Sequence, residues 1–148
     1  MKKVYMLMIL ILFITGCASQ TMQLKVRGSS VLNPDKNYHS LPVKITIYQL
    51  KQKDKFNQAD FYGLWRNPYQ WLGNDLVEQQ SALISPGETK TIEINLHKKT
   101  QYIGVVGIFR KPGEDHWRVI KTVKENLPLT HNQIIISLVS NRIYLREH

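Results

Sequence analysis

Short runs of alternating apolar and polar residues recur along this chain and limit it to a β-rich fold. In LPVKITIYQL (41–50), Val43, Ile45 and Ile47 share one face, which is the two-residue period of a strand. Its β-branched residues favour a strand with its other face in solvent. Similar alternating runs, or the continuous apolar runs of a central strand, occupy the segments 22–29, 89–98, 102–110, 116–124, 133–140 and 142–147.

Proline–glycine pairs separate several of these runs. SPGE (85–88) and KPGE (111–114) each place proline before glycine, where proline presets φ and glycine accepts a positive φ. We expect the second pair to close a hairpin. Seven to eight short strands divided by such turns predict a mainly β fold, a two-sheet β-sandwich.

Residues 54–78 interrupt the strand pattern with helical spacing. DKFNQADFYGLWRN (54–67) repeats apolar positions four residues apart, and Pro68 is expected to end that helix. We expect the aromatic residues of this insert to pack it onto the sandwich, with a ligand-binding cluster as the alternative. These residues are Phe56, Phe61, Tyr62, Trp65 and Tyr69.

The N-terminus has the features of a lipoprotein signal. Lys2 and Lys3 precede an apolar run, 4–14, which as a helix would span about 16 Å of the roughly 30 Å bilayer core. The run therefore fits a secretory signal. ITGC (14–17) holds the only cysteine and resembles a lipobox, which implies removal of residues 1–16 and lipidation of Cys17. A buried cysteine behind an ordinary signal is the alternative.

An acylated Cys17 would act as a membrane anchor, because two or more acyl chains bind a bilayer stably. Ala18, in place of aspartate, implies by the same resemblance the periplasmic face of the outer membrane. We expect residues 17–23 to form a short tether and 24–148 one domain. With its one cysteine lipidated, that domain has no disulfide and depends on packing.

The charge of the mature chain limits its partners. Setting aside Lys2 and Lys3 from the 20 basic residues leaves 18 against 11 acidic ones, a net charge of +7. Such a balance suits nucleic acid, lipid phosphates or an acidic protein face. A periplasmic protein rarely meets nucleic acid, so we exclude that partner and expect an acidic protein face.

Several motifs behind the lipobox occur in a recognisable order. They are LNPD (32–35), LPVKITIYQL (41–50), FNQADF with Leu64 (56–64), LGNDL (72–76), SPGE (85–88), YIGVVGIFR (102–110) and WRV (117–119). In this order the chain resembles the outer-membrane lipoproteins of the bacterial type VI secretion system, the TssJ/SciN family. The resemblance covers nearly the whole mature chain. It implies a transthyretin-like β-sandwich with a small helical insert.

The resemblance also implies a partner. Family members bind the periplasmic C-terminal domain of a large inner-membrane subunit (TssM-like) and hold the envelope-spanning complex to the outer membrane. Their contact is a loop after the first strand, here NPDKNYHS (33–40). Two family features differ here: a Gly-Arg-like pair is replaced by His39-Ser40, and an alanine by Gly107. The expected partner-binding residues are Asn33, Pro34, Asp35, Lys36, Asn37, Tyr38 and His39.

The residues of this loop partly support such a role on their own. Asn33-Pro34-Asp35 is turn chemistry, and tyrosines such as Tyr38 are enriched at interface anchors. A solvated loop with Tyr38 folded back on the sandwich is the alternative.

An enzyme would need chemistry that the sequence does not display. The five histidines, at positions 39, 97, 116, 131 and 148, form no metal-ligand pair such as H-x-H. There is no G-x-S-x-G elbow, and the carboxylates Asp60 and Asp75 are expected to cap or contact backbone. We expect no catalytic residue, cofactor, metal or small-molecule substrate. A pilotin-like assembly lipoprotein and a tethered periplasmic hydrolase are the alternatives.

Overall fold

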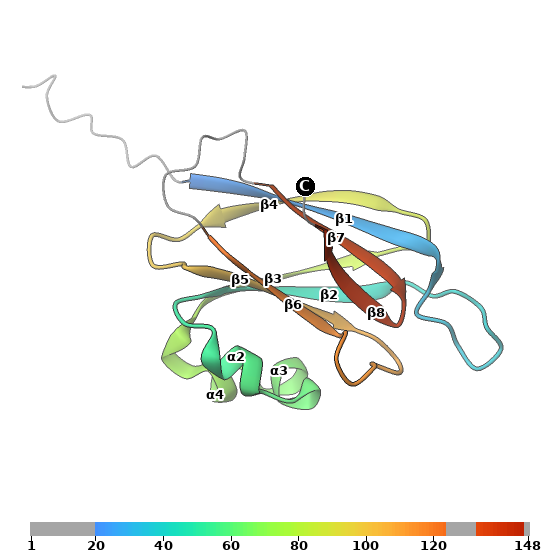
Figure 1. Cartoon of the computed structure of the whole chain (residues 1–148), viewed down its shortest axis with the longest axis horizontal. Coiled ribbons are helices and arrows are strands. Elements are labelled where there is room, and N and C mark those ends of the chain that lie inside the picture. The colour runs from blue at the N-terminus through green and yellow to red at the C-terminus, as the bar shows by residue number, and fades with distance from the viewer. Residues whose placement is uncertain (1–19, 124–132, 147–148) are drawn as a thin grey trace, which may run out of the picture.

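Two four-stranded sheets pack against each other, and three short helices cover the outer face of one of them (Figure 1). The computed structural model describes residues 20–123 and 133–146. The sheets have the strand orders β4-β1-β7-β8 and β3-β2-β5-β6. The strands are β1 Gln20–Leu32, β2 Val43–Leu50, β3 Leu76–Ile84, β4 Thr89–Leu96, β5 Tyr102–Ile108, β6 Arg118–Thr122, β7 Gln133–Ser140 and β8 Arg142–Arg146. The predicted two-sheet β-sandwich is confirmed.

Strand β1 is the longest strand and organises the first sheet. It pairs antiparallel with β4 and parallel with β7. Its first residue, Gln20, already pairs with Leu96, and Met22 is buried. Residues 20–23 are therefore part of the sandwich, which corrects the prediction that they form a tether.

The core lies between the two sheets. The inward positions of β1, β2, β4 and β7 are occupied by aliphatic side chains that are almost completely buried. Burying each such side chain contributes about 1.5–3 kcal/mol. Examples are Leu24, Val26, Val43, Ile45, Ile47, Ile94 and Ile136.

The helical insert consists of α2 Asp54–Gln58, α3 Phe61–Arg66, α4 Pro68–Leu72 and a 3-10 turn, Gly73–Asp75. The predicted single helix over 54–67 is broken at Ala59, which is extended, with ψ at 145°. Its end before Pro68 is as predicted, since α3 ends at Arg66, and Pro68 begins α4. Proline fits the first helical turn because the N–H there has no helical acceptor. The insert ends at Asp75, and β3, which the sequence did not predict, follows at once.

The insert buries a face of the sheet that the sequence predicted to be in solvent. Thr46 and Tyr48 on β2 point toward the helices and are buried, although Lys44 stays exposed. The Tyr48 hydroxyl donates to the Leu64 carbonyl at 2.8 Å. Phe56 packs against β5 so closely that a Cβ on Gly104 would lie 2.6 Å from its ring.

Most aromatic residues of the insert do not pack onto the sandwich, which corrects that prediction. Phe56 is buried and Phe61 half-buried, but Tyr62, Trp65 and Tyr69 are exposed. Helices of five or six residues make fewer than two turns. Each therefore presents only one or two side chains to the sheet.

The two Pro-Gly turns have different outcomes. Gly87 has a φ of +74°, and Glu88 N donates to Ser85 O at 3.1 Å, so the predicted turn at 85–88 is confirmed. Residues 109–117, which contain the second pair, form a wider connection between β5 and β6, and Gly113 has no positive φ. The predicted hairpin is confirmed, because β5 pairs antiparallel with β6, but its connection is longer than a tight Pro-Gly turn.

Candidate protein-binding loop

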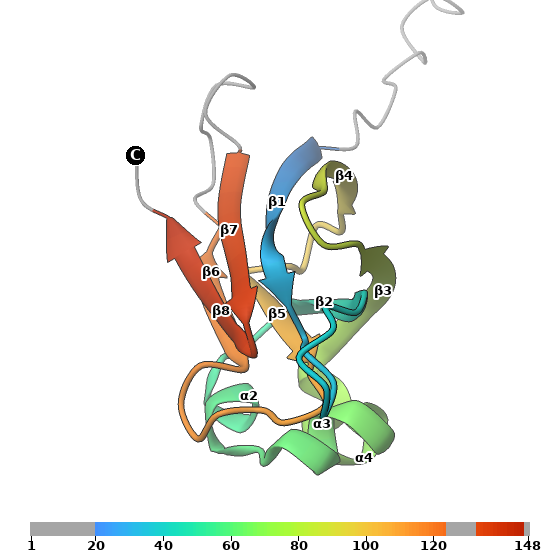
Figure 2. The ribbon, with the colours of Figure 1, turned by 90° about the vertical axis from the view of Figure 1, so that its right-hand side faces the viewer.

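The segment 33–42 connects β1 in one sheet to β2 in the other. It projects from the end of the sandwich opposite to the start of β1, as both views show (Figures 1 and 2). The predicted partner-binding residues, 33–39, all lie in this segment. The structure thus places them at one exposed end of the molecule. We call residues 33–40 the tip loop.

Asn33 forms the base of the tip loop. Its side chain donates to Pro42 O at 3.0 Å and accepts from Arg110 N at 2.9 Å, while its backbone N–H donates to Ser140 O at 2.8 Å. Asn33 is buried and has a φ of +45°, which asparagine tolerates better than most residues. With both ends of its amide engaged internally, Asn33 positions the loop, and it is the residues beyond it that reach solvent.

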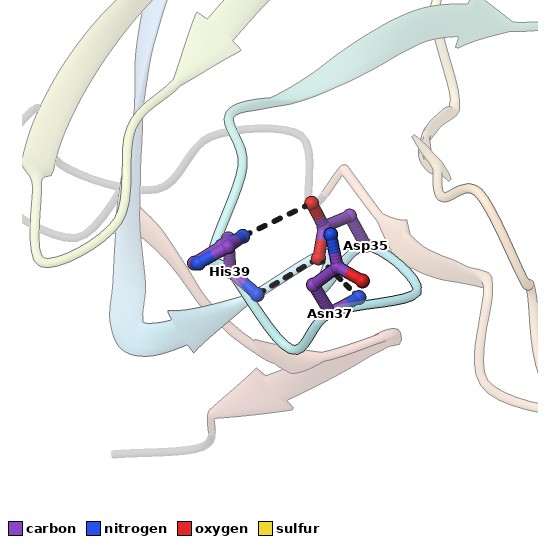
Figure 3. A network of polar contacts seen from close by, with 3 residues as sticks. All are labelled: Asp35, Asn37 and His39. Atoms are coloured by element: carbon purple, nitrogen blue, oxygen red, sulfur yellow. Dashed lines mark hydrogen bonds and ion pairs between the residues drawn. The ribbon is translucent and has the colours of Figure 1, made fainter.

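Asp35 organises the loop's backbone (Figure 3). One carboxylate oxygen accepts from Asn37 N at 2.7 Å and His39 N at 2.9 Å, and the other lies 3.3 Å from His39 Nδ1. The bond from the His39 backbone is the main reason why the pKa of Asp35 lies below its usual 3.8. His39 O also accepts from Asp35 N at 2.9 Å, closing the loop on itself.

Tyr38 occupies the tip of this closed loop. Its φ is +64°, and its N–H donates to Asp35 O at 3.1 Å. A bulky residue in this left-handed region is backbone strain held by its surroundings. Its side chain is 89% exposed, so it is not folded back on the sandwich. Lys36, Asn37 and His39 are exposed beside it, whereas Pro34 is half-buried.

The side chains that an enzyme could use are dispersed or engaged elsewhere. His97 and His116 are exposed. Asp60 caps α3 by accepting from Gly63 N, as predicted, whereas the Asp75 carboxylate pairs with Lys55 Nζ at 3.4 Å instead of contacting backbone. Within residues 20–123 and 133–146, no three histidine, cysteine, aspartate or glutamate side chains gather to hold a metal ion.

Other predicted features lie outside the described residues. These are Cys17, the signal segment 1–16, His131 and His148. In the part of the chain that is described, no helix has the length and apolar character to cross a bilayer.

Comparison with known proteins decides the family. Residues 20–141 match the family of type VI secretion lipoproteins named T6SS-SciN, which includes VasD, EvfM and TssJ. The chain belongs to the type VI secretion lipoprotein family. This confirms the resemblance drawn from the motifs. No curated protein sequence matches it significantly.

Solved structures of type VI secretion lipoproteins share the fold of this family member. The T6SS lipoprotein TssJ1 from Pseudomonas aeruginosa is 28% identical, with a TM-score of 0.76, covering 88% of this chain and 98% of TssJ1. Serratia marcescens Lip, a membrane-bound component of the type VI secretion system, is 20% identical, with a TM-score of 0.79 and coverages of 86% and 97%. A chain in the structure of the T6SS protein TssM C-terminal domain (869-1107) from EAEC is 25% identical, with a TM-score of 0.75 and coverages of 86% and 98%.

The family is one of secretion lipoproteins and is not a known class of enzyme. Sequence reasoning placed the tip loop correctly but missed how it is held. The burial of Asn33 depends on Arg110 and Ser140, which are far away in the chain. The Asp35–His39 spacing could have indicated the local bonds, because aspartate commonly accepts from backbone N–H groups two to four residues ahead.

Proposed function

We propose that this chain anchors a type VI secretion membrane complex to the outer membrane. In this proposal Cys17 carries the lipid, and the tip loop binds the periplasmic C-terminal domain of a large inner-membrane subunit (TssM-like). The family assignment supports the first part. The likeness to a chain found in a structure of a TssM C-terminal domain supports the second.

The observation that carries the proposal is the position of the tip loop relative to the expected anchor. Cys17 precedes Gln20, the start of β1, by three residues. Strand β1 has 13 residues, with an irregularity between Gly28 and Leu32. At about 3.3 Å per residue, its two ends lie up to roughly 40 Å apart. A protein held at Cys17 on the periplasmic face of the outer membrane can thus present the tip loop toward the periplasm.

The chemistry of the tip loop suits a protein surface. Tyr38 offers a large amphipathic ring, and Lys36 adds a positive charge beside it. The internal bonds of Asp35 hold the loop in one conformation, which lowers the entropy lost on binding. The basic chain fits an acidic face on the partner, which would speed association at low salt. This function requires no cofactor, metal, nucleic acid, small-molecule substrate or catalytic step.

Co-isolation from membranes tests this function. The full chain should co-purify with the inner-membrane subunit from detergent-solubilised envelopes. Deletion of residues 35–39 should abolish co-purification while the protein remains folded and in the outer-membrane fraction. Undiminished recovery of the subunit with the deletion variant would refute the tip loop as the contact.

A further inference from the structure

A second exposed surface lies on helices α3 and α4. Tyr62 is 61% exposed, Trp65 42%, Tyr69 67% and Trp71 44%. Isolated apolar side chains on a surface are common, but four large aromatic residues in ten consecutive positions are not. We call Tyr62, Trp65, Arg66 and Trp71 the insert patch. The first three contact one another, and Trp71 on α4 packs against Gly63 of α3.

The rings of the insert patch are fixed in place. Phe61 lies between them and the buried Trp117, with ring centroids 5.4 Å from Trp117, 5.5 Å from Tyr62 and 5.9 Å from Trp65. Trp71 packs on Gly63 so tightly that a Cβ there would lie 2.2 Å from the indole nitrogen. A rigid aromatic surface loses little conformational entropy when it binds, which is a property of interface hot spots.

Arg66 gives the insert patch its charge. Its guanidinium lies 5.0 Å from the ring centroid of Trp65 and 5.6 Å from that of Tyr62. This cation–π arrangement holds the guanidinium near the two rings. Tryptophan, tyrosine and arginine are the residues most enriched at hot spots, and the fork of N–H groups on arginine matches a carboxylate.

The insert patch and the tip loop border the same segment, the β5–β6 connection (109–117). Asn33 in the tip loop accepts from Arg110 at one end of this connection. Trp117, at its other end, packs against Phe61 of α3. Figure 1 shows the connection lying between the tip loop and the helices. One partner surface can therefore contact both.

Charge and distance disfavour two other occupants of the insert patch. In a symmetric contact the insert patch of one copy would face that of the other, which has no carboxylate to pair with Arg66. The outer membrane is the second of these occupants. The expected anchor precedes β1, whereas the insert covers the sheet that does not contain β1. The three residues from Cys17 to Gln20 span about 10 Å, whereas a sheet spacing and a helix layer separate the two sides by about 20 Å.

We infer that the insert patch is a second docking site for the partner of the tip loop, and that it receives an acidic, partly apolar protein surface. This inference rests on the proposed function for the identity of that partner. The carboxylates of the partner would pair with Arg66, and its apolar side chains would cover Tyr62 and Trp65.

Affinity measurements on the full lipidated chain in nanodiscs test this inference, with the purified periplasmic domain of the inner-membrane subunit as the probe. The double variant Tyr62→Ala/Trp65→Ala should weaken binding at least tenfold and lower the thermal midpoint by only a few degrees, because both rings are partly exposed and alanine favours the helix. Arg66→Glu keeps both rings and should weaken binding as well. This loss of affinity should be larger at low salt than at high salt, because salt screens the charge. Arg142→Glu on β8 and Leu83→Ala on β3 alter exposed side chains of other strands and should change the affinity less than twofold.

The outcomes separate this inference from the proposed function. Unchanged affinity of both patch variants, together with weaker binding by a Tyr38→Asn variant, would overturn the second site and leave the proposed function standing. No binding by the unmodified chain would overturn both. Two further outcomes would also overturn the inference, if partner binding persists in the patch variants. Loss of dimerisation in these variants would assign the insert patch to a second copy. Loss of anchor-independent binding to lipid vesicles would assign it to lipid.

Discussion

At the scale of single residues, one carboxylate determines the shape of the tip loop. Asp35 is exposed enough that its bonds add little to global stability, yet it accepts from two backbone N–H groups. These bonds keep Tyr38 in its left-handed conformation. The charge of Asp35 therefore controls the presentation of the ring more than the folding of the sandwich.

The amides of Asn37 and His39 should report this role of Asp35 as the pH falls. Because the pKa of Asp35 is lowered, with the His39 backbone bond as the main cause, the bonds persist at neutral pH and are lost as the pH falls through a value below 3.8. NMR titration should show both amide shifts moving together with that midpoint. A midpoint at or above 3.8 would contradict the hydrogen-bonded geometry, and Asp35→Asn should remove the transition.

Tyr48 links the insert to the sheet by a single bond. Its hydroxyl donates to Leu64 O, and the residue four positions after Leu64 is Pro68, which has no N–H to supply the helical bond. Tyr48→Phe should leave that buried carbonyl without this donor and cost about 1–3 kcal/mol. Burial raises the pKa of Tyr48 to about 12.

The pH dependence of the Tyr48→Phe effect has a definite sign. A folded-state pKa above the usual 10 means that the stabilisation is complete below pH 10 and is lost as the pH rises toward 12. Thermal melts should show the difference between the two proteins shrinking as the pH rises from 10 to about 12. A difference that is constant over this range would contradict the burial of a neutral Tyr48.

At the scale of elements, the insert is attached by close packing against a glycine and by one arginine. Phe56 occupies the space above Gly104 on β5. The Arg118 guanidinium, on β6, donates to the carbonyls of Phe56, Asn57 and Ala59 at the end of α2. Helices this short have little stability alone, so these contacts explain why they form.

Gly104→Ala should therefore destabilise the protein and loosen the insert. The added Cβ would lie 2.6 Å from the Phe56 ring, and overpacking of this kind costs about 1–3 kcal/mol. Gly113→Ala is the matched control, since a Cβ there meets nothing within 4 Å. Chemical denaturation measures both. Equal stability of the two variants would contradict the docking of Phe56 on β5.

The same elements show how far the sequence could predict the fold. Strands with one face in solvent, such as β4, were visible because burial follows their alternation. Strand β3 was missed because its edge position and the neighbouring insert leave its residues half-buried without a two-residue period. Likewise, helical spacing identified which aromatic residues share a face, but the direction of Tyr62 and Trp65 depends on tertiary contacts with Phe61 and Trp117.

At the scale of the whole molecule, the sandwich separates two ends with different tasks. The proposed anchor precedes β1, and the tip loop follows it. The core between the sheets uses aliphatic residues from β1, β2, β4 and β7, all of which lie beyond Gln20. Anchoring and folding should therefore be independent.

Cys17→Ser tests that independence. The variant should lose incorporation of labelled fatty acid and leave the outer-membrane fraction, because serine has no thiol to lipidate. Circular dichroism of the variant should keep the β-rich spectrum of the unmodified protein. Continued labelling and membrane retention would contradict the lipobox assignment.

Calorimetric titration of the periplasmic domain of the inner-membrane subunit into the full chain tests the central claim most directly. Tyr38→Asn removes the ring but keeps a residue that tolerates a positive φ, so the loop should retain its shape. We predict a Kd at least tenfold weaker, about 1.4 kcal/mol, with the thermal midpoint within a few degrees of the unmodified protein. An unchanged Kd for Tyr38→Asn would contradict the claim that the tip loop is the contact.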